Sequence, residues 1–267
     1  MTAVLVTCEH GGHRLPRRYR HLFAGREEVL LSHRGWDPGA LRLARALARL
    51  LRAPLVSSTW TRLLVDLNRS EGNPALWSRA SSTLSGTERE RLLEEIHRPH
   101  WQRVESEIRR LLEQGSEPRP VVHLAVHSFA PVLDGRVRRF DVGLLYDPRR
   151  APEAGLAARW QRSLRRALPH LAVWRNHPYR GWTDGLPTRM RERFAPDLYL
   201  GIELEVSQRR LGLDGSLPVG LAPVFADSLE QADASLPAPG ISHCVARGTG
   251  VQFRGGGNRP GRRSPPT

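Results

Sequence analysis

The 267-residue sequence contains no lysine, and all 41 of its basic residues are arginine. Its formal net charge of +14 would by itself point to nucleic acid as a partner. The exclusive use of arginine is, however, typical of a genome rich in G and C. Aromatic residues make up only 6% of the chain, and no basic stretch alternates with aromatic side chains that could stack on bases. We therefore expect no nucleic-acid partner.

Cysteine is also scarce: the only two, Cys8 and Cys244, cannot form a disulfide framework or a zinc site built from thiolates. Any metal ligands are then imidazole and carboxylate groups. No apolar run approaches the roughly 18 residues that a membrane span needs. The N-terminal residues lack the basic segment of a secretory signal and soon reach the acidic Glu9. These absences predict a cytoplasmic protein without a membrane partner.

The apolar pattern predicts one folded domain, residues 1–233, of the α/β class. Continuous apolar runs predict strands at 3–7, 55–58, 63–66, 121–126, 142–146, 171–174 and 200–206. Helical periodicity predicts helices at 38–52, 87–115, 152–169 and 185–194. Strands that alternate with helices favour a sheet with helices on both faces. The remaining segment, 234–267, is rich in proline, glycine and arginine, and we predict a largely disordered tail.

Two polar patterns mark the starts of predicted helices. Asp37 before Pro38 combines a preferred N-cap residue with a first-turn proline. Thr87 and Glu90 have the spacing of a capping box at the start of the long helix.

Two histidines, His10 and His127, each follow an apolar run that predicts a buried strand. Ligands of open α/β sheets bind at the carboxyl ends of the strands, so both imidazoles could face one cavity. Two imidazoles and one carboxylate, with a position left for water, form a recurring catalytic zinc site. Asp37 is the first choice for the carboxylate, although an N-cap is its alternative role. Glu9 and His13 are the substitutes.

Glu203 and Glu205 lie two residues apart on the last predicted strand and therefore point to the same face. A strand buried on both faces would not carry two carboxylates without a use for them. One of them could activate water as a general base. The alternative is an edge strand with one solvated face.

His97 and His100 lie one turn apart on the long predicted helix, a spacing that also occurs among metal ligands. No further ligand accompanies them. We predict that both are surface residues.

The predicted strand at 63–66 runs into Asn68 and Arg69. A strand end presents side chains rigidly, and the planar guanidinium of arginine suits a carboxylate. This pair indicates a site for an anionic substrate group.

Taken in order, seven motifs resemble the N-formylglutamate amidohydrolase family and span residues 8 to 208. They are CEHGGHRLP at 8–16, HRGWDPGA at 33–40, TRLLVDLNR at 61–69, HSF at 127–129, VGLLYD at 142–147, NHPYRG at 176–181 and ELEVSQ at 203–208. The resemblance implies a three-layer fold like that of the zinc exopeptidases, with a mixed, mostly parallel sheet between helices. It also implies metal-assisted hydrolysis of an N-acyl amino acid. Thr61 stands where the family often has serine.

The resemblance also implies a role for each residue of the site. The metal ligands would be His10, Asp37 and His127, and the general base would be Glu205 in preference to Glu203. The substrate-binding residues would be Arg62, Asn68, Arg69 and Tyr179.

The sequence thus predicts an amidohydrolase that uses one divalent metal, zinc, and cleaves a small carboxylated N-acyl amino acid such as N-formylglutamate. The loop at 175–186 is more similar to a broad branch of the family than to the deformylases of histidine degradation, which leaves the substrate open. One rival is a deacylase or peptidase that acts on a longer substrate. Another is a carboxylate-binding protein without turnover on the same fold.

Overall fold

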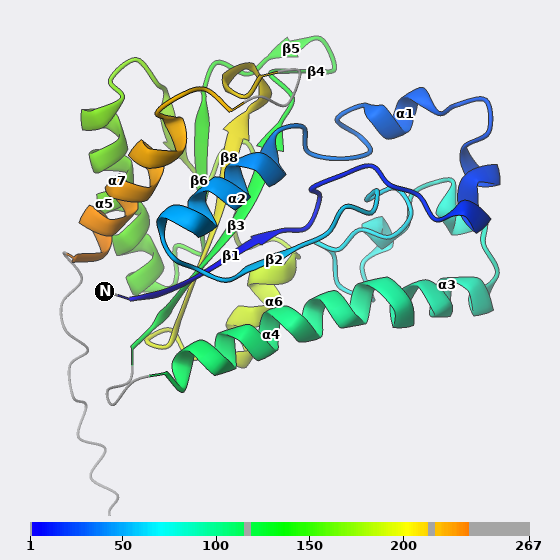
Figure 1. Ribbon diagram of the computed structural model, residues 1–267, viewed down its shortest axis with the longest axis horizontal. Coiled ribbons are helices and arrows are strands. Elements are labelled where there is room, and N and C mark those ends of the chain that lie inside the picture. The colour runs from blue at the N-terminus through cyan, green and yellow to red at the C-terminus, as the bar shows by residue number, and fades with distance from the viewer. Residues whose placement is uncertain (1, 115–118, 213–216, 235–267) are drawn as a thin grey trace, which may run out of the picture. The chain divides into compact units, whose positions relative to one another are not determined.

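Six of the apolar segments form one sheet in the order β2-β1-β3-β8-β6-β7 (Figure 1). The computed structural model describes residues 2–114, 119–212 and 217–234. All neighbouring strands are parallel except β6 and β8, which are antiparallel. The strands of the sheet are β1 (Ala3–Cys8), β2 (Leu55–Ser57), β3 (Val121–Phe129), β6 (Val142–Leu145), β7 (Val173–Arg175) and β8 (Tyr199–Ser207). The predicted mixed, mostly parallel sheet is confirmed.

Helices cover both faces of this sheet because successive strand residues alternate between two apolar clusters. On one side, residues such as Val6 and Val122 pack against α2 (Ala40–Leu50), α5 (Ala151–Ala167) and α7 (Leu221–Ala234). On the other side, Leu5, Val121 and Tyr199 pack against two further helices. These are α4 (Arg98–Leu112) and α6 (Leu186–Arg193). The predicted three-layer α/β architecture is therefore confirmed.

A third apolar cluster lies beyond the carboxyl end of β1, on the right of Figure 1. It joins Tyr19, in the 3-10 helix η1 (Arg17–Phe23), to Leu64, Val65 and residues of 76–96. The short helices of this region are α1 (Glu28–Leu31), η2 (Pro74–Leu76), η3 (Ser81–Thr83), α3 (Gly86–Leu92) and the π-helical turn η4 (Leu93–His97). We call this region the loop lobe, residues 15–31 and 60–97. It stands where ligands of α/β sheets bind.

One predicted strand is wrong. Residues 63–66 belong to a turn and the irregular segment after it, and Leu64 and Val65 are buried in the cluster of the loop lobe. The backbone N–H of Asp66 bonds the carbonyl of Leu76, in the same lobe, instead of a neighbouring strand. A short apolar run can therefore be buried among loops just as it can be buried in a sheet.

Both predicted helix starts are also wrong in detail. The N-cap of α2 is Gly39, with φ of 81°, and the Asp37 side chain does not cap the helix. The capping box at α3 is formed by Ser85 and Glu88, two residues before the predicted pair. The single long helix predicted at 87–115 consists of α3, η4 and α4 in succession.

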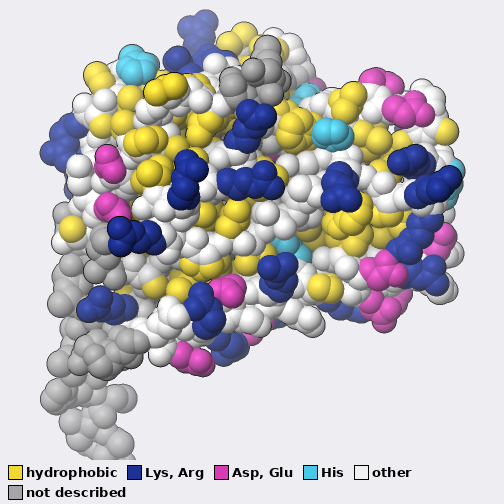
Figure 2. All heavy atoms as spheres, viewed as in Figure 1, with side chains coloured by type: hydrophobic (Ala, Val, Ile, Leu, Met, Phe, Trp, Pro, Cys, Tyr) yellow, Lys and Arg dark blue, Asp and Glu magenta, His cyan; other side chains and the backbone are white. Residues whose placement is uncertain are grey.

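Several elements were not predicted: the short helices η1, α1, η2 and η3 of the loop lobe, α7, the 3-10 helix η5 (Gln208–Arg210) and the hairpin of β4 (Val132–Leu133) and β5 (Arg136–Val137). Apart from Ala234, the predicted tail at 234–267 lies outside the described residues. No helix among the described residues is long and apolar enough to cross a membrane. On the face that Figure 2 shows, the basic side chains are scattered among apolar and uncharged groups instead of forming one stripe.

Candidate active site

One cavity of about 290 Å³ brings together all eight residues that the sequence assigned to the site. It opens where β1, β3 and β8 end and the loop lobe begins. Its lining includes His10, Asp37, Arg62, Asn68, Arg69, His127, Tyr179 and Glu205. Glu203 lines it as well.

The backbone brings the three predicted metal ligands to one point. His10 follows β1 directly, and His127 lies near the end of the neighbouring strand β3. Asp37 precedes α2, and its backbone N–H donates to the carbonyl of His10 at 2.9 Å. The loop before the helix is therefore tied to the end of the strand.

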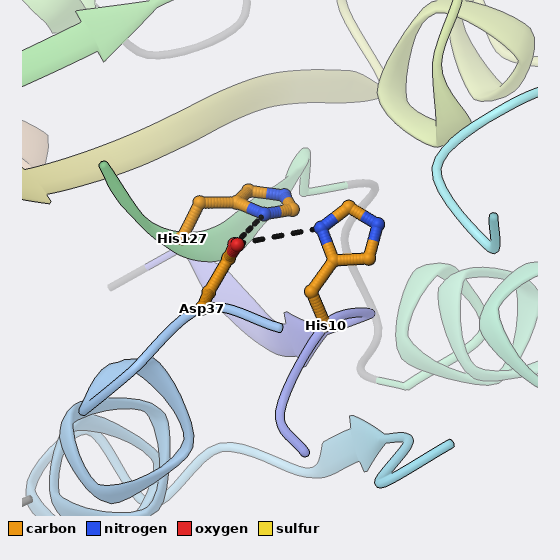
Figure 3. A group of neighbouring side chains, drawn as sticks. All are labelled: His10, Asp37 and His127. Atoms are coloured by element: carbon orange, nitrogen blue, oxygen red, sulfur yellow. Dashed lines mark hydrogen bonds and ion pairs between the residues drawn. The ribbon is translucent and has the colours of Figure 1, made fainter. Parts of the chain in front are cut away.

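A single oxygen of Asp37 faces both imidazoles (Figure 3). Its Oδ2 lies 2.9 Å from Nδ1 of His127 and 3.4 Å from Nδ1 of His10. All three side chains are buried, and their ligand atoms lie within 4.8 Å of one another. Nδ1 of His10 is a buried atom that has no hydrogen-bond partner among the described residues. Two imidazole nitrogens and one carboxylate oxygen in this arrangement could hold a divalent metal such as zinc.

The outward nitrogen of each imidazole faces a carboxylate. Nε2 of His10 lies 2.7 Å from Oδ1 of Asp66, and Nε2 of His127 lies 3.1 Å from Oε2 of Glu9. Carboxylates in this position orient metal-binding histidines and increase their basicity. They leave Nδ1 of each ring free to face the metal. The residue set therefore fits a metal.

The charges of the three groups are strongly coupled. Burial opposes ionisation of Asp37, but His10 and Arg62 hold the pKa of its carboxyl below the usual range. Burial also opposes the charged form of His127, yet its contacts with Asp37 and Glu9 raise the pKa of its imidazole well above the ordinary value. A metal that binds here must therefore displace a proton from His127.

Glu205 has the environment of a general base. Burial is the main cause that raises the pKa of its carboxyl to about 7, and the charges of Asp37 and Glu203 add to the effect. Its Oε2 is buried without a hydrogen-bond partner among the described residues. Glu203 is only half-buried, and its Oε2 accepts from Nδ2 of Asn68 at 3.4 Å. The geometry thus favours Glu205 over Glu203 as the base.

Asn68 and Arg69 also line the cavity and are held by main-chain groups. Oδ1 of Asn68 accepts from the backbone N–H of Leu186 at 2.7 Å. Nη1 of Arg69 donates to the carbonyls of Asn68 and Asp184 at 2.7 and 3.1 Å. Within the described ranges, no carboxylate forms an ion pair with Arg69. Its guanidinium is oriented but not neutralised, as an anion-binding arginine requires.

Comparison with known proteins agrees with this geometry. Residues 2–211 match the family model of N-formylglutamate amidohydrolase, which is more than half of the chain. The chain belongs to the N-formylglutamate amidohydrolase family. It is accordingly a hydrolase that acts on amides. No curated protein matches the chain significantly.

Two solved structures are similar to this member of the N-formylglutamate amidohydrolase family. The gene product Atu2144 from Agrobacterium tumefaciens is 29% identical with a TM-score of 0.75, over 88% of this chain and 91% of that one. The N-formylglutamate amidohydrolase from Ralstonia eutropha JMP134 is 18% identical with a TM-score of 0.61, over 88% of this chain and 94% of that one. The second likeness shows the shared fold.

Arg62, predicted to bind substrate, is already paired. Its Nη2 lies 2.9 Å from Oδ2 of Asp66, and its Nη1 lies 3.5 Å from Oδ1 of Asp37. These contacts support the two carboxylates around His10. Sequence analysis did not assign a role to Asp66, although it lies within the motif at 61–69.

Tyr179 lies at the mouth of the cavity and is 47% exposed. Its hydroxyl accepts from Nη1 of Arg138 at 3.4 Å, and the guanidinium of Arg138 lies over the rings of Tyr179 and Phe129. Arg138 and Arg180 also line the cavity, and neither forms an ion pair with a carboxylate in the part of the chain that the structure describes. Sequence analysis did not point to Arg138, because this residue follows the unpredicted hairpin.

The remaining histidines of the sequence analysis lie elsewhere. His13 is exposed and packs beside Trp36, so it is not near enough to replace Asp37 as a ligand. The prediction that His97 and His100 are surface residues is wrong. They are 2% and 7% exposed, because they lie on the inner side of η4 and α4.

Proposed function

We propose that this family member is a metal-dependent amidohydrolase that cleaves the acyl amide of a small carboxylated N-acyl amino acid such as N-formylglutamate. The observation that carries the proposal is the buried group of His10, Asp37 and His127 with the unpartnered Oε2 of Glu205 in the same cavity. Zinc is the metal that such nitrogen and oxygen ligands suit.

The residues divide the reaction between them. His10, Asp37 and His127 would hold the metal, which supplies polarisation of the acyl carbonyl and acidification of a water molecule. Glu205 takes the proton of the attacking water and passes it to the leaving amine. Because the free Glu205 carboxyl has a pKa of about 7, it can exchange a proton in both directions near neutral pH.

The cations of the cavity select the substrate. Arg69 binds the α-carboxylate through a bidentate pair, and Asn68 adds its amide, so that the scissile bond is held near the metal ligands. Arg138 and Arg180 place further positive charge at the mouth. Because these two guanidinium groups form no ion pair with a carboxylate among the described residues, they favour a substrate with a second acidic group, as in N-formylglutamate.

The test is hydrolysis of N-formylglutamate by protein of known metal content. We expect about one divalent metal per chain, loss of activity with a chelator, and recovery when zinc is returned. The α-amide of the same substrate should be a poor substrate. Unchanged activity after complete metal removal would contradict metal dependence. If only longer N-acyl compounds or peptides are cleaved, the proposed substrate is wrong and the protein is a deacylase or peptidase. If the substrate binds but is never cleaved, the protein is a carboxylate-binding protein.

A further inference from the structure

Two buried histidines stand behind the active site, one turn apart where η4 passes into α4. Neither His97 nor His100 lines the cavity. His97 nevertheless contacts Arg69, which lines the cavity, and His100 faces Glu9, which in turn faces the lining residue His127. They serve two different parts of the site.

His97 supports the substrate side. Its Nε2 lies 2.8 Å from the carbonyl oxygen of Arg69, so its ring N–H donates there. The ring stacks on Trp101 with centroids 4.9 Å apart, and Trp101 donates to the carbonyl of Leu67 at 2.8 Å. One helix face therefore fixes the backbone of residues 67 to 69, from which Asn68 and Arg69 project.

His100 supports the metal side. Its Nε2 faces Oε1 of Glu9 at 3.8 Å, and the other oxygen of Glu9 faces Nε2 of His127 at 3.1 Å. The Glu9 side chain is completely buried, and neither of its oxygens has a hydrogen-bond partner among the described residues. A buried carboxylate without donors is costly, so the two imidazoles that flank it are its stabilising groups.

We propose that His97 and His100 are separate positioning residues: His97 orients the carboxylate clamp through Arg69, and His100 orients the metal ligand His127 through Glu9. The proposal rests on the proposed function for the identity of the clamp and the metal. Neither histidine touches the reacting atoms.

The two roles predict effects on different measured quantities. Loss of an outer partner of a metal-binding histidine weakens metal affinity by about 10- to 100-fold. His100 acts on His127 through that partner, Glu9, so the loss of His100 should have an effect at the lower end of this range. Loss of the hydrogen bond that holds the Arg69 carbonyl shifts the clamp instead, which raises KM and lowers kcat/KM. A general loss of stability would move both quantities in both variants.

The experiment measures zinc affinity by competition with a chromophoric chelator and, separately, KM and kcat/KM for N-formylglutamate at saturating zinc. For His100→Leu we expect zinc affinity to fall about tenfold with KM changed less than about twofold. For His97→Leu we expect zinc affinity within about twofold of wild type and KM raised about tenfold. Each variant is the matched control for the other.

The glutamine variants test whether the ring N–H is the group that matters. Glutamine can place an amide donor near the position of Nε2, so His97→Gln and His100→Gln should restore most of each loss. Asparagine is equally polar but too short to do so. If the leucine variants do not fold, the difference between glutamine and asparagine at each position decides the question. If the glutamine and asparagine variants at a position have equal zinc affinity and equal KM, the proposal is overturned.

Failure of the proposed function is recognised independently. If wild type hydrolyses no N-acyl amino acid, the zinc affinities still test His100, and binding of glutamate, measured calorimetrically, still tests His97. If wild type is active but His100→Leu keeps full zinc affinity, only the assignment of His100 fails. A KM unchanged in His97→Leu removes the assignment of His97.

Discussion

Glu205 stands directly opposite His127 in the parallel pairing of β8 with β3. Residues paired in this way point to the same face of a sheet, so the proposed base and one proposed metal ligand project side by side into the cavity. Glu203, two residues earlier on β8, pairs with Ala125 and lies further from the end of the strand. The register of the two strands therefore places Glu205, and not Glu203, beside His127.

The first prediction concerns this choice of base. Glu205→Gln should keep the fold and the metal but reduce kcat about 100-fold or more, the usual scale for a general base. Glu203→Gln is the matched control and should be milder, since the carboxylate of Glu203 accepts a hydrogen bond from Asn68 and a glutamine oxygen could still do so. Steady-state rates at saturating zinc measure both. The opposite ranking would make Glu203 the base.

The metal ligands provide the second prediction. His10→Ala, His127→Ala and Asp37→Ala should each remove most of the bound metal, as elemental analysis of purified protein would report. Asp37→Ala is a clean test because its side chain does not cap α2. His13→Ala is the control, since His13 is exposed, and should retain the metal. Full occupancy in any of the first three variants would remove that residue from the ligand set.

Arg69 is the subject of the third prediction. Arg69→Ala and Arg69→Lys should both lower kcat/KM for N-acyl amino acids without metal loss, because lysine keeps the charge but not the planar pair of donors. Amidation of the substrate's α-carboxylate should harm the wild type strongly and the alanine variant little. If amidation harms both equally, the carboxylate must be bound elsewhere, with Arg138 and Arg180 as the next choices.

The fourth prediction concerns pH and the buried His123. Burial is the main cause that lowers the pKa of its imidazole to about 4, while the ring bonds Thr7 and Tyr199. Between about pH 6.5 and 4 the unfolded chain binds this proton and the folded chain does not. The free energy of unfolding should therefore fall on acidification through this window, by about 1.4 kcal/mol per pH unit at most.

Urea titrations of metal-free protein at several pH values would measure this slope. His123→Gln keeps polar atoms toward Thr7 and Tyr199 but does not titrate, so its slope between pH 6.5 and 4 should be smaller than that of wild type. Identical slopes would show that other groups cause the acid sensitivity.

The sequence was sufficient for most of the sheet and for His10 and His127 as candidate ligands, because both predictions depend on local patterns. Buried strands are continuous apolar runs, and His10 and His127 are the polar residues that follow two of them. The same local rule misled at 63–66, where the apolar side chains are buried by the loop lobe instead of by helices. The four residues 63–66 contain no signal that distinguishes burial in the loop lobe from burial in a sheet covered by helices.

Contacts between distant segments could not be predicted. His97 and His100 differ from surface histidines only in the side of the helix that faces the sheet, which depends on how η4 and α4 dock. Asp66 and His10 are separated by 56 positions in the sequence, and only the folded chain brings them together. Pairings of this kind are set by tertiary structure, and a single sequence does not record them.

The orientation of the two imidazoles has a mechanical consequence. His10 and His127 extend from the sheet, whereas Asp66, behind His10, belongs to the loop lobe. A metal held by the inward nitrogens would thus be linked to the loop lobe through the pairs of His10 with Asp66 and of Asp37 with Arg62. Its removal should therefore weaken the attachment of the lobe while the contacts within the sheet core remain.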